Sequence, residues 1–406
     1  MTPLGKPLPQ AKDPLDPWRK QFPIVGKTTY LISNSLGAMP ARTKDDLAEY
    51  ADTWAGRGVR AWGEGWWEMA LTVGDLVGRI VHAPPGSITM HQNVTLASAV
   101  VSSCFDYRRA RNRVVMVDME FPSLLYLYHR MGAHGARVEV VKSRDGVTLP
   151  MDELLDAIDD RTALVPISHV LFRSSYLVDA KAVIEKAHRV GARVCLDAFQ
   201  SAGTVPVDLA ALGTDFAVGG ALKWLCGGPG AAWLYVRPDL RAELKPRVTG
   251  WQAHAEPFAF EAGPIRFRED GGRFLTGTPN IPGLYAAREG IRIVGEIGAE
   301  AIRAKSLRQT ERLIALADRE GWEVTAPRDP ERRGGTVAID VPYGAAVSAE
   351  LNARDIVVDY RPGAGVRLSP HFYTRDRELD EAVAAIRDIL ETNAYEKHLH
   401  AHRTVT

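Results

Sequence analysis

The sequence has little cysteine, no net charge and no long apolar run, and each shortage excludes a class of protein. Its three cysteines, Cys104, Cys195 and Cys226, include no CxxC pair, which indicates free thiols in a reducing compartment and excludes a small disulfide scaffold. The 50 Lys and Arg residues balance the 50 Asp and Glu residues, so no net charge attracts nucleic acid or an anionic membrane. Charged residues interrupt every apolar stretch before the roughly 18 residues that a spanning helix needs. We therefore predict a cytoplasmic protein with a small-molecule partner.

What is present is an ordinary globular composition. The 406 residues are 46% apolar and 25% charged, and this length allows two or three domains of roughly 150 residues each. The first 23 residues contain prolines and charges but no continuous apolar segment. They are therefore typical of an extended arm and not of a signal peptide.

From about residue 45, segments of helical period alternate with short β-branched runs bounded by Gly, Asp or Pro. The runs predicted to be buried parallel strands are 113–117, 137–141, 163–167, 193–196, 216–218 and 232–236. Helices are predicted between them, for example over 151–158 and 179–190. This alternation predicts an α/β protein whose mostly parallel sheet is covered on both faces.

The pattern changes after about residue 279. Two long helical stretches, two short strands and a last helix are predicted there, over 284–297, 299–320, 336–340, 356–359 and 377–392. Pro282 and Gly283 interrupt the pattern just before the first of these helices. We therefore expect an N-terminal arm (1–45), a large α/β domain (46–282) and a smaller C-terminal α+β domain (283–406).

An acid and an amine follow two of the predicted strands. Asp197 and Lys223 lie 26 residues apart, each where a strand ends. In an open α/β sheet the ligand crevice lies at the carboxyl ends of the strands, so both side chains are expected to face one pocket. A lysine there condenses with an aldehyde and a carboxylate holds a ring nitrogen protonated, which are the electronic needs of pyridoxal phosphate (PLP). On its own, the pair is equally well explained by a helix-capping aspartate and a solvated lysine.

Further motifs point to the same cofactor. They are Ser33 to Pro40 (SNSLGAMP), Phe121-Pro122-Ser123, Asp197-x-x-Gln200, Lys223 followed by Gly227-Gly228-Pro229-Gly230, Gly250-Trp251-x-x-His254, and Thr276-Gly277-Thr278-Pro279. With them, the sequence resembles the kynureninase branch of the class V aminotransferase group, within the fold-type I PLP enzymes, over residues 25–395. The resemblance implies a large domain with a mostly parallel, seven-stranded type of sheet, a smaller C-terminal domain, and PLP as the cofactor.

Matched to the motifs, the resemblance assigns the residues around the cofactor ring. Lys223 is implied to be the Schiff-base lysine, and Asp197 to pair with the ring nitrogen. Gln200 is implied to reach the ring hydroxyl, and Phe121 to stack on the ring, as aromatic side chains do. For Phe121 a plain core position is the alternative.

The resemblance also assigns the residues that bind the phosphate and those that a neighbouring subunit contributes. Asn93 and Val94 match a phosphate-binding turn before the predicted helix 96–103, where backbone N–H groups suit an anion. Gly277 and Thr278 match a segment that reaches the phosphate of a neighbouring subunit, and Trp251 matches an aromatic near it. The resemblance therefore implies a homodimer with shared active sites, although turn and core roles are open for these three residues.

The resemblance also implies an amino-acid substrate. Arg367 matches the arginine that grips the substrate carboxylate with two hydrogen bonds, for which a surface arginine is the alternative. Asn34 and Ser35 match a turn on the substrate side of the pocket. Trp62 lies in a Gly- and Trp-rich stretch that either lines this pocket or belongs to the core. His254 either contacts the ligand or has a structural role.

The sequence departs from the resemblance at several positions. Leu222 replaces the tyrosine before the lysine and has no proton to give, Gln200 replaces a histidine, and Leu124 replaces an aspartate. Desulfurases carry hydroxyl or imidazole groups where Gly220 and Leu222 stand, so the hypothesis here is that Arg173 supplies a substitute cation for the phosphate. No cysteine lies within 359–365, which argues against desulfurase chemistry.

Metal and nucleotide motifs are absent or weak. There is no GxxxxGK[ST] loop and no HExxH helix, and the glycines at 228–230 lead into a strand and not into a helix. His398, His400 and His402 alternate near the C-terminus, a pattern more typical of a solvated tail than of a metal site. No metal is predicted.

Three functions remain open at this stage. The first is hydrolytic or lytic cleavage at the β-carbon of an aromatic or acyl-alanine substrate, as the kynureninase resemblance implies. The second is a transaminase that converts an amino acid to a keto acid, which the loss of the tyrosine favours. The third is a PLP-binding protein without turnover, against which the retained lysine, aspartate and arginine argue.

Overall fold

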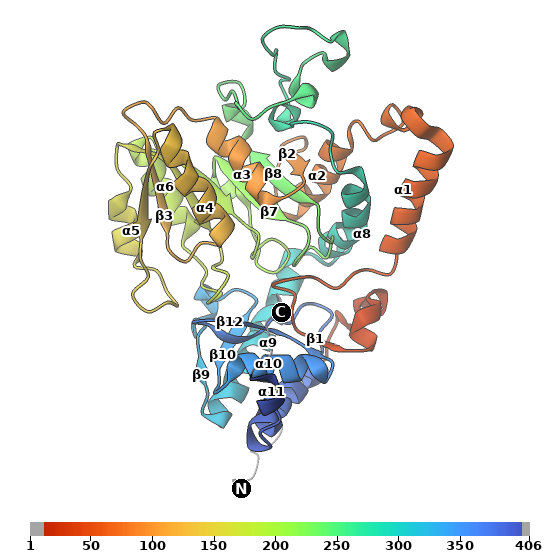
Figure 1. Cartoon of the computed structure of the whole chain (residues 1–406), viewed down its shortest axis with the longest axis vertical. Coiled ribbons are helices and arrows are strands. Elements are labelled where there is room, and N and C mark those ends of the chain that lie inside the picture. Colours follow the sequence, from red (N-terminus) through yellow and green to blue (C-terminus); the bar gives the residue numbers. More distant parts are fainter. Residues whose placement is uncertain (1–11, 400–406) are drawn as a thin grey trace.

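The computed structural model describes residues 12–399, and its main element is a seven-stranded sheet with helices on both faces (Figure 1). The strand order is β2-β8-β7-β6-β5-β3-β4. The strands are β2 (Ile88–His91), β3 (Arg113–Val117), β4 (Arg137–Val141), β5 (Thr162–Ser168), β6 (Arg193–Asp197), β7 (Phe216–Gly220) and β8 (Ala232–Val236). The predicted fold class, α/β with a mostly parallel sheet, is confirmed.

Strand β8 corrects one prediction, because it runs antiparallel to both of its neighbours, β7 and β2. The sequence pattern of 232–236 predicts a parallel strand, since the run is apolar throughout and buried on both faces. The connection determines the direction instead. Residues 221–231 contain no helix, and a parallel strand would need a crossover of about a dozen residues or more.

Alternate residues of each strand face two separate apolar layers. Val114 and Met116 of β3 pack in one layer with α3 and α4, while Val115 and Val117 pack in the other with α2, α5, α6 and α8. The helices are α1 (Thr43–Arg57), α2 (Met69–Ile80), α3 (Val94–Ser103), α4 (Pro122–Arg130), α5 (Met151–Ala157), α6 (Ala180–Val190), α7 (Leu209–Leu212) and α8 (Ile281–Ile297). Coverage of both faces explains why the strands are continuously apolar.

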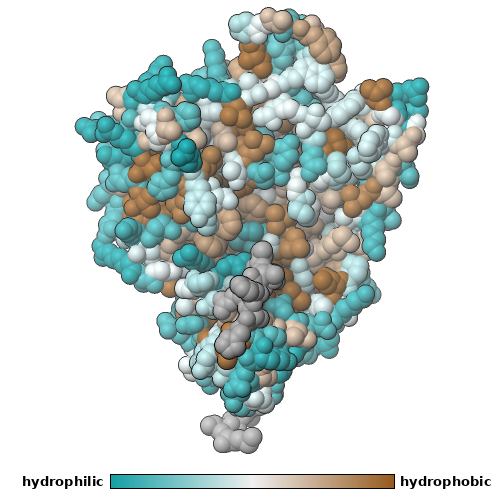
Figure 2. Space-filling view, in the orientation of Figure 1, coloured by the Kyte–Doolittle hydropathy of each residue, from teal (hydrophilic) through white to brown (hydrophobic). Residues whose placement is uncertain are grey.

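The C-terminal part contains a second, four-stranded antiparallel sheet of order β12-β13-β10-β9. The helices and strands of this C-terminal part are α9 (Ala299–Glu320), β9 (Glu323–Val324), β10 (Val337–Asp340), α10 (Gly344–Ala353), β11 (Ile356–Val357), β12 (Asp359–Arg361), β13 (Gly365–Leu368) and α11 (Asp376–Glu391). This part forms the tapered lower end in Figures 1 and 2, where its tip is mostly hydrophilic and apolar residues gather nearer the large part.

The expected boundary at 282/283 falls inside the first turn of α8. Helix α8 packs against α1 and α2 of the large part, whereas α9 packs against α11 and β10 of the small part. Gly298, with a φ of +85°, lies between α8 and α9. We therefore propose that the domain boundary lies at Gly298.

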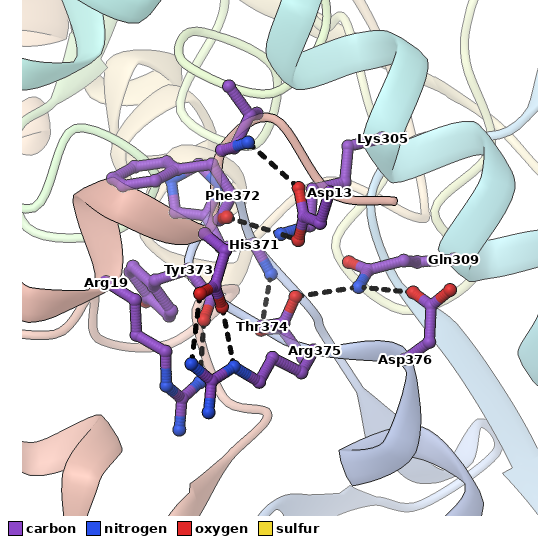
Figure 3. Close-up of polar contacts among 12 residues, drawn as sticks. Asp13, Arg19, Lys305, Gln309, His371, Phe372, Tyr373, Thr374, Arg375 and Asp376 are labelled. Carbon is purple, nitrogen blue, oxygen red and sulfur yellow. Dashed lines mark hydrogen bonds and ion pairs between the residues drawn. The ribbon is translucent and has the colours of Figure 1, made fainter. Parts of the chain in front are cut away.

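The described part of the N-terminal arm is not extended but folded onto the small part. It forms short 3-10 helices over Asp16–Gln21 and Pro23–Gly26, and then strand β1 (Thr29–Tyr30), which pairs with β11. In Figure 3, Lys305 of α9 holds the carboxylate of Asp13 and the carbonyl of Phe372, each at 2.5 Å. The arm therefore connects the small part to the segment that crosses the candidate site.

Two glycines of α2 differ in how closely their backbone approaches the sheet. A Cβ atom at Gly74 would lie 2.3 Å from the carbonyl oxygen of Ile88, whereas one at Gly78 would meet nothing closer than 3.4 Å. We expect Gly74→Ala to destabilise the protein by about 1–3 kcal/mol. Gly78→Ala, in the same helix, should be neutral or stabilise it by up to about 1 kcal/mol. Urea unfolding measures both, and equal stabilities would contradict this close packing.

Candidate active site

A cavity of about 350 Å³ lies at the carboxyl ends of β5, β6 and β7, between the large part and the small sheet. Nine residues predicted from the sequence line it: Asn34, Ser35, Asn93, Val94, Phe121, Asp197, Gln200, Lys223 and Arg367. The other lining residues are Thr95, Ser123, Leu124, Ser168, Val170, Phe172, Phe199, Leu222 and Arg361. The structure therefore brings residues from distant parts of the chain into one site.

Asp197 and Lys223 are held in this cavity by adjacent strands. Asp197 is the last residue of β6, and its carboxylate accepts the backbone N–H of Phe199 at 2.8 Å. Burial raises the pKa of Asp197 to about 6, against the lowering effect of that hydrogen bond and of Lys223. Burial, helped by the charge of Arg367, lowers the pKa of Lys223 to about 8. The lysine is thus a more available nucleophile and base than a solvated amine.

Two aromatic rings face the lysine. Its Nζ lies 4.4 Å from the centroid of Phe199 and 5.7 Å from that of Phe121. Phe199 was not predicted as a site residue. Gly220, at the end of β7, makes room for it, because a Cβ there would lie 2.3 Å from Phe199 Cζ. A ring therefore occupies the space that a larger residue at position 220 would need.

A helix start in the cavity lining suits an anion. Asn93 caps α3, and its Oδ1 accepts the N–H of Leu96 at 2.9 Å. The N–H groups of the first turn have no acceptor within the helix, and Val94 and Thr95 of this turn line the cavity. Backbone N–H groups and the helix dipole favour a phosphate at this position.

The small sheet contributes two arginines. Arg367 donates to Asp359 Oδ1 and Oδ2 at 2.8 and 2.5 Å and to the carbonyl of Phe172 at 2.5 Å. Arg361 was not predicted as a site residue. Its Nη2 lies 3.2 Å from Oδ2 of the same aspartate. A guanidinium has five N–H donors, so Arg367 keeps one on each terminal nitrogen for a ligand. Arg173 lies over the ring of Phe172 and does not line the cavity, contrary to the hypothesis that it replaces a phosphate-binding cation.

The segment after β1 closes one side. The backbone carbonyl of Asn34 accepts from Gln200 Nε2 at 3.0 Å, and Gln200 Oε1 accepts from Trp224 Nε1 at 2.9 Å. Gly37 permits this crossing, because a Cβ there would lie 2.1 Å from the carbonyl oxygen of Lys223. The side-chain amide of Asn34 is buried in the cavity wall without a hydrogen-bond partner among the described residues. It is therefore available to a ligand.

Five predicted residues lie outside this cavity: Trp62, Trp251, His254, Gly277 and Thr278. Trp251 is 44% exposed, and His254 Nδ1 accepts the N–H of Glu256 at 2.9 Å. The carbonyl of Thr278 accepts from Gln92 Nε2 at 3.4 Å, next to the phosphate turn. Within a single chain these residues do not contribute to the site.

Residues 12–399 contain no candidate metal site and no candidate membrane span. No group of three or more His, Cys, Asp or Glu side chains gathers there in a way that suits a metal ion. His398 lies 2.9 Å from a carboxylate oxygen of Glu350, and His400 and His402 fall outside the described residues. No described helix has the length and apolarity needed to cross a bilayer.

Comparison with known proteins identifies the family of the chain and its fold. The family model "Aminotransferase class-V" matches residues 29–369. A kynureninase from Burkholderia pseudomallei is 31% identical over 398 residues, which cover 94% of each chain. A kynureninase from Pseudomonas fluorescens is 30% identical over 95% of this chain and 94% of its own. The fold is similar to a cysteine desulfurase from Thermococcus onnurineus NA1 (TM-score 0.82, 21% identity, 95% of this chain and 100% of that one).

The fold and the site define a fold-type I PLP enzyme. The chain belongs to the class V aminotransferase family, in its kynureninase-like branch. The cavity suits PLP, since it offers a desolvated lysine, a carboxylate, an aromatic ring and the free N–H groups of a helix start. The protein is therefore a PLP-dependent enzyme that acts on an amino acid.

The pKa of Lys223 predicts how fast the apo-protein takes up its cofactor. Only the neutral amine attacks the aldehyde of PLP. The rate of covalent attachment should therefore rise with pH and reach half of its maximum near pH 8. Stopped-flow absorbance measures this rate, and Lys223→Ala is the control without attachment. A midpoint near the ordinary lysine value of 10.5 would contradict the desolvated site.

The raised pKa of Asp197 predicts that replacing this residue has opposite effects on the stability of the apo-protein and on its affinity for the cofactor. Its folded pKa lies above its ordinary value, so the stability that protonation supplies is lost as pH rises through about 6. Apo Asp197→Asn should therefore be more stable than the wild type by about 1–3 kcal/mol at pH 8 and about equal at pH 4, yet bind PLP more weakly. Urea unfolding at both pH values tests this, and a variant less stable at both would refute it.

Proposed function

We propose that the protein hydrolyses an aromatic or acyl-alanine amino acid at its β-carbon, as the name kynureninase implies for its relatives. The supporting observation is that Lys223, Asp197 and Arg367 face one cavity with aromatic walls. The kynureninases that match over nearly the whole chain support the same reaction class.

Arg367 holds the substrate in this proposal. The two N–H groups that Asp359 and Phe172 leave free form a fork for the α-carboxylate. The same contacts fix the guanidinium plane before the substrate arrives, so binding orders few additional groups. The free amide of Asn34 offers a donor and an acceptor to a polar part of the substrate.

Lys223 and Asp197 carry out the proton chemistry. PLP, when bound, supplies an electron sink for the carbon that loses its proton. Lys223, with a pKa near 8, is suited to take up and return the α-proton close to neutral pH. Asp197 keeps the ring nitrogen protonated. Phe121, Phe172 and Phe199 leave an apolar space that suits a flat side chain.

One observation favours aminotransfer as the second candidate. Leu222, next to the lysine, lines the cavity and has no proton to donate. Transamination needs no proton donor at that position, and the same lysine, aspartate and arginine serve it. A requirement for a keto acid distinguishes the two reactions.

We also propose that two chains complete each other's sites. Trp251, Gly277 and Thr278 lie outside their own cavity, as expected if they serve a neighbour. Trp251 lies beside the exposed rings of Phe258 and Phe260, which are 61% and 73% accessible in the single chain. A second copy would cover these rings.

The decisive experiment incubates PLP-loaded protein with L-kynurenine, without a keto acid, and follows the products by mass spectrometry. Anthranilate and alanine are expected. Arg367→Lys keeps the charge but loses the fork, and we expect it to lower kcat/KM by about 10- to 100-fold. Intact kynurenine, together with keto-acid-dependent turnover of another amino acid, would refute hydrolysis in favour of the second candidate.

A further inference from the structure

The side-chain amide of Gln200 is held from two sides, and both contacts require the same orientation. Gln200 lines the cavity and is 8% exposed. Trp224 Nε1 donates to its Oε1 at 2.9 Å, and its Nε2 donates to the backbone carbonyl of Asn34 at 3.0 Å. An indole N–H can only donate and a carbonyl oxygen can only accept. The amide oxygen of Gln200 therefore points to Trp224, and the amide nitrogen points to Asn34.

This orientation leaves one hydrogen-bond donor for the cavity. The NH2 group of Gln200 has two N–H bonds, and the Asn34 carbonyl is the only acceptor that it has within residues 12–399. With that single bond the amide could still turn about its terminal torsion, which has a broad energy minimum. The second bond, from Trp224, fixes the plane of the amide and with it the direction of the unused N–H.

Trp224 is itself held by the small part. It is 1% exposed, and its indole meets the ring of His371 edge-on, with 5.3 Å between the centroids. His371 Nε2 donates to the backbone carbonyl of Trp224 at 2.8 Å. A Cβ atom at Gly335 would lie 2.9 Å from Cη2 of the indole. The indole therefore has little room to turn away from Gln200.

The segment that carries His371 is fixed to α9 in turn. The backbone carbonyl of Phe372 accepts from Lys305 Nζ at 2.5 Å, and that of Thr374 accepts from Gln309 Nε2 at 2.9 Å (Figure 3). Contacts therefore run without a gap from the small part, through Trp224, to a side chain of the cavity wall.

The chemistry of PLP indicates which of its atoms the unused N–H serves. Besides the aldehyde, which Lys223 takes, PLP has three polar groups: the ring nitrogen, the phosphate and the ring oxygen. Asp197 suits the ring nitrogen, and the start of α3 suits the phosphate. The ring oxygen is left for the donor of Gln200. The resemblance implies the same contact, but not what orients the amide.

We propose that Trp224 is a positioning residue that fixes Gln200 as a hydrogen-bond donor to the ring oxygen of bound PLP. The small part keeps Trp224 in this role through His371 and Gly335. Trp224 does not line the cavity and acts only through Gln200. This proposal rests on the cofactor and not on the reaction, so failure of kynurenine cleavage would leave it intact.

A pH titration of the absorbance of PLP-loaded protein, without substrate, reads this contact. The absorbance changes when the nitrogen that joins Lys223 to the cofactor loses its proton. The ring oxygen then bears its negative charge alone, so a donor to that oxygen favours the loss. We expect Gln200→Met to raise the midpoint by about one pH unit, because one hydrogen bond to a charged oxygen is removed.

Trp224→Phe removes the indole N–H and keeps Gln200. We expect it to raise the midpoint by about half a unit to one unit and the Kd for PLP by about threefold to tenfold. In the double variant Trp224→Phe/Gln200→Met, both quantities should equal those of Gln200→Met alone, because Trp224 acts only through Gln200. Effects that add would show that Trp224 acts by another route, such as displacement of Lys223, and would overturn the proposal.

Trp233→Phe is the matched control. Trp233 is also buried and does not line the cavity, and its Nε1 has no hydrogen-bond partner among the described residues. This variant should keep the wild-type midpoint. The same unchanged midpoint in Trp224→Phe would overturn the proposal, and an unchanged midpoint in Gln200→Met would do so by removing Gln200 as the donor.

A second replacement serves if Trp224→Phe does not fold. Site-specific incorporation of benzothienylalanine at position 224 exchanges the indole N–H for sulfur and keeps the shape of both rings. The midpoint and the Kd should rise as predicted for Trp224→Phe, whereas wild-type values of both would overturn the proposal.

Discussion

The structure depends on holding a lysine and an aspartate out of water at the ends of two adjacent strands. Desolvation is the largest influence on both groups, lowering the pKa of Lys223 and raising that of Asp197. A lone buried charge is costly unless it is paired or neutralised. The fold holds both groups in place because strands β6 and β7 are buried between neighbouring strands, which fix the backbone from which the two side chains project.

The rest of the cavity follows from this constraint. Phe199 lies over the amine and fits only because Gly220 has no side chain. The small part brings Arg367 and Arg361 to the same cavity and balances them with Asp359. The cavity is therefore complete only where the small part packs on the large one. Ion pairs fix the N-terminal arm to α9 and α11 of the small part.

Much of the fold and part of the site could be predicted from the sequence. Strand ends carry local signals, so the positions of Asp197 and Lys223 along the chain indicate a shared pocket, and the further motifs decide between this interpretation and a helix-capping aspartate with a solvated lysine. The direction of β8 could not be predicted from its own residues, because a buried antiparallel strand and a buried parallel strand have the same apolar pattern. Arg361 reaches the cavity through packing between elements far apart in the sequence, for which no local pattern exists. Ser168 and Phe199 do lie next to predicted strand ends, and that position is the one local signal that marks them.

The central claim is that the cavity around Lys223 is the cofactor site. Reduction of the PLP-loaded protein with borohydride, followed by peptide mapping, tests it most directly, because the reagent makes the lysine–cofactor bond permanent. The account predicts one pyridoxyl group per chain, attached to Lys223. Stoichiometric label on another lysine, with Lys223 unmodified, would contradict it.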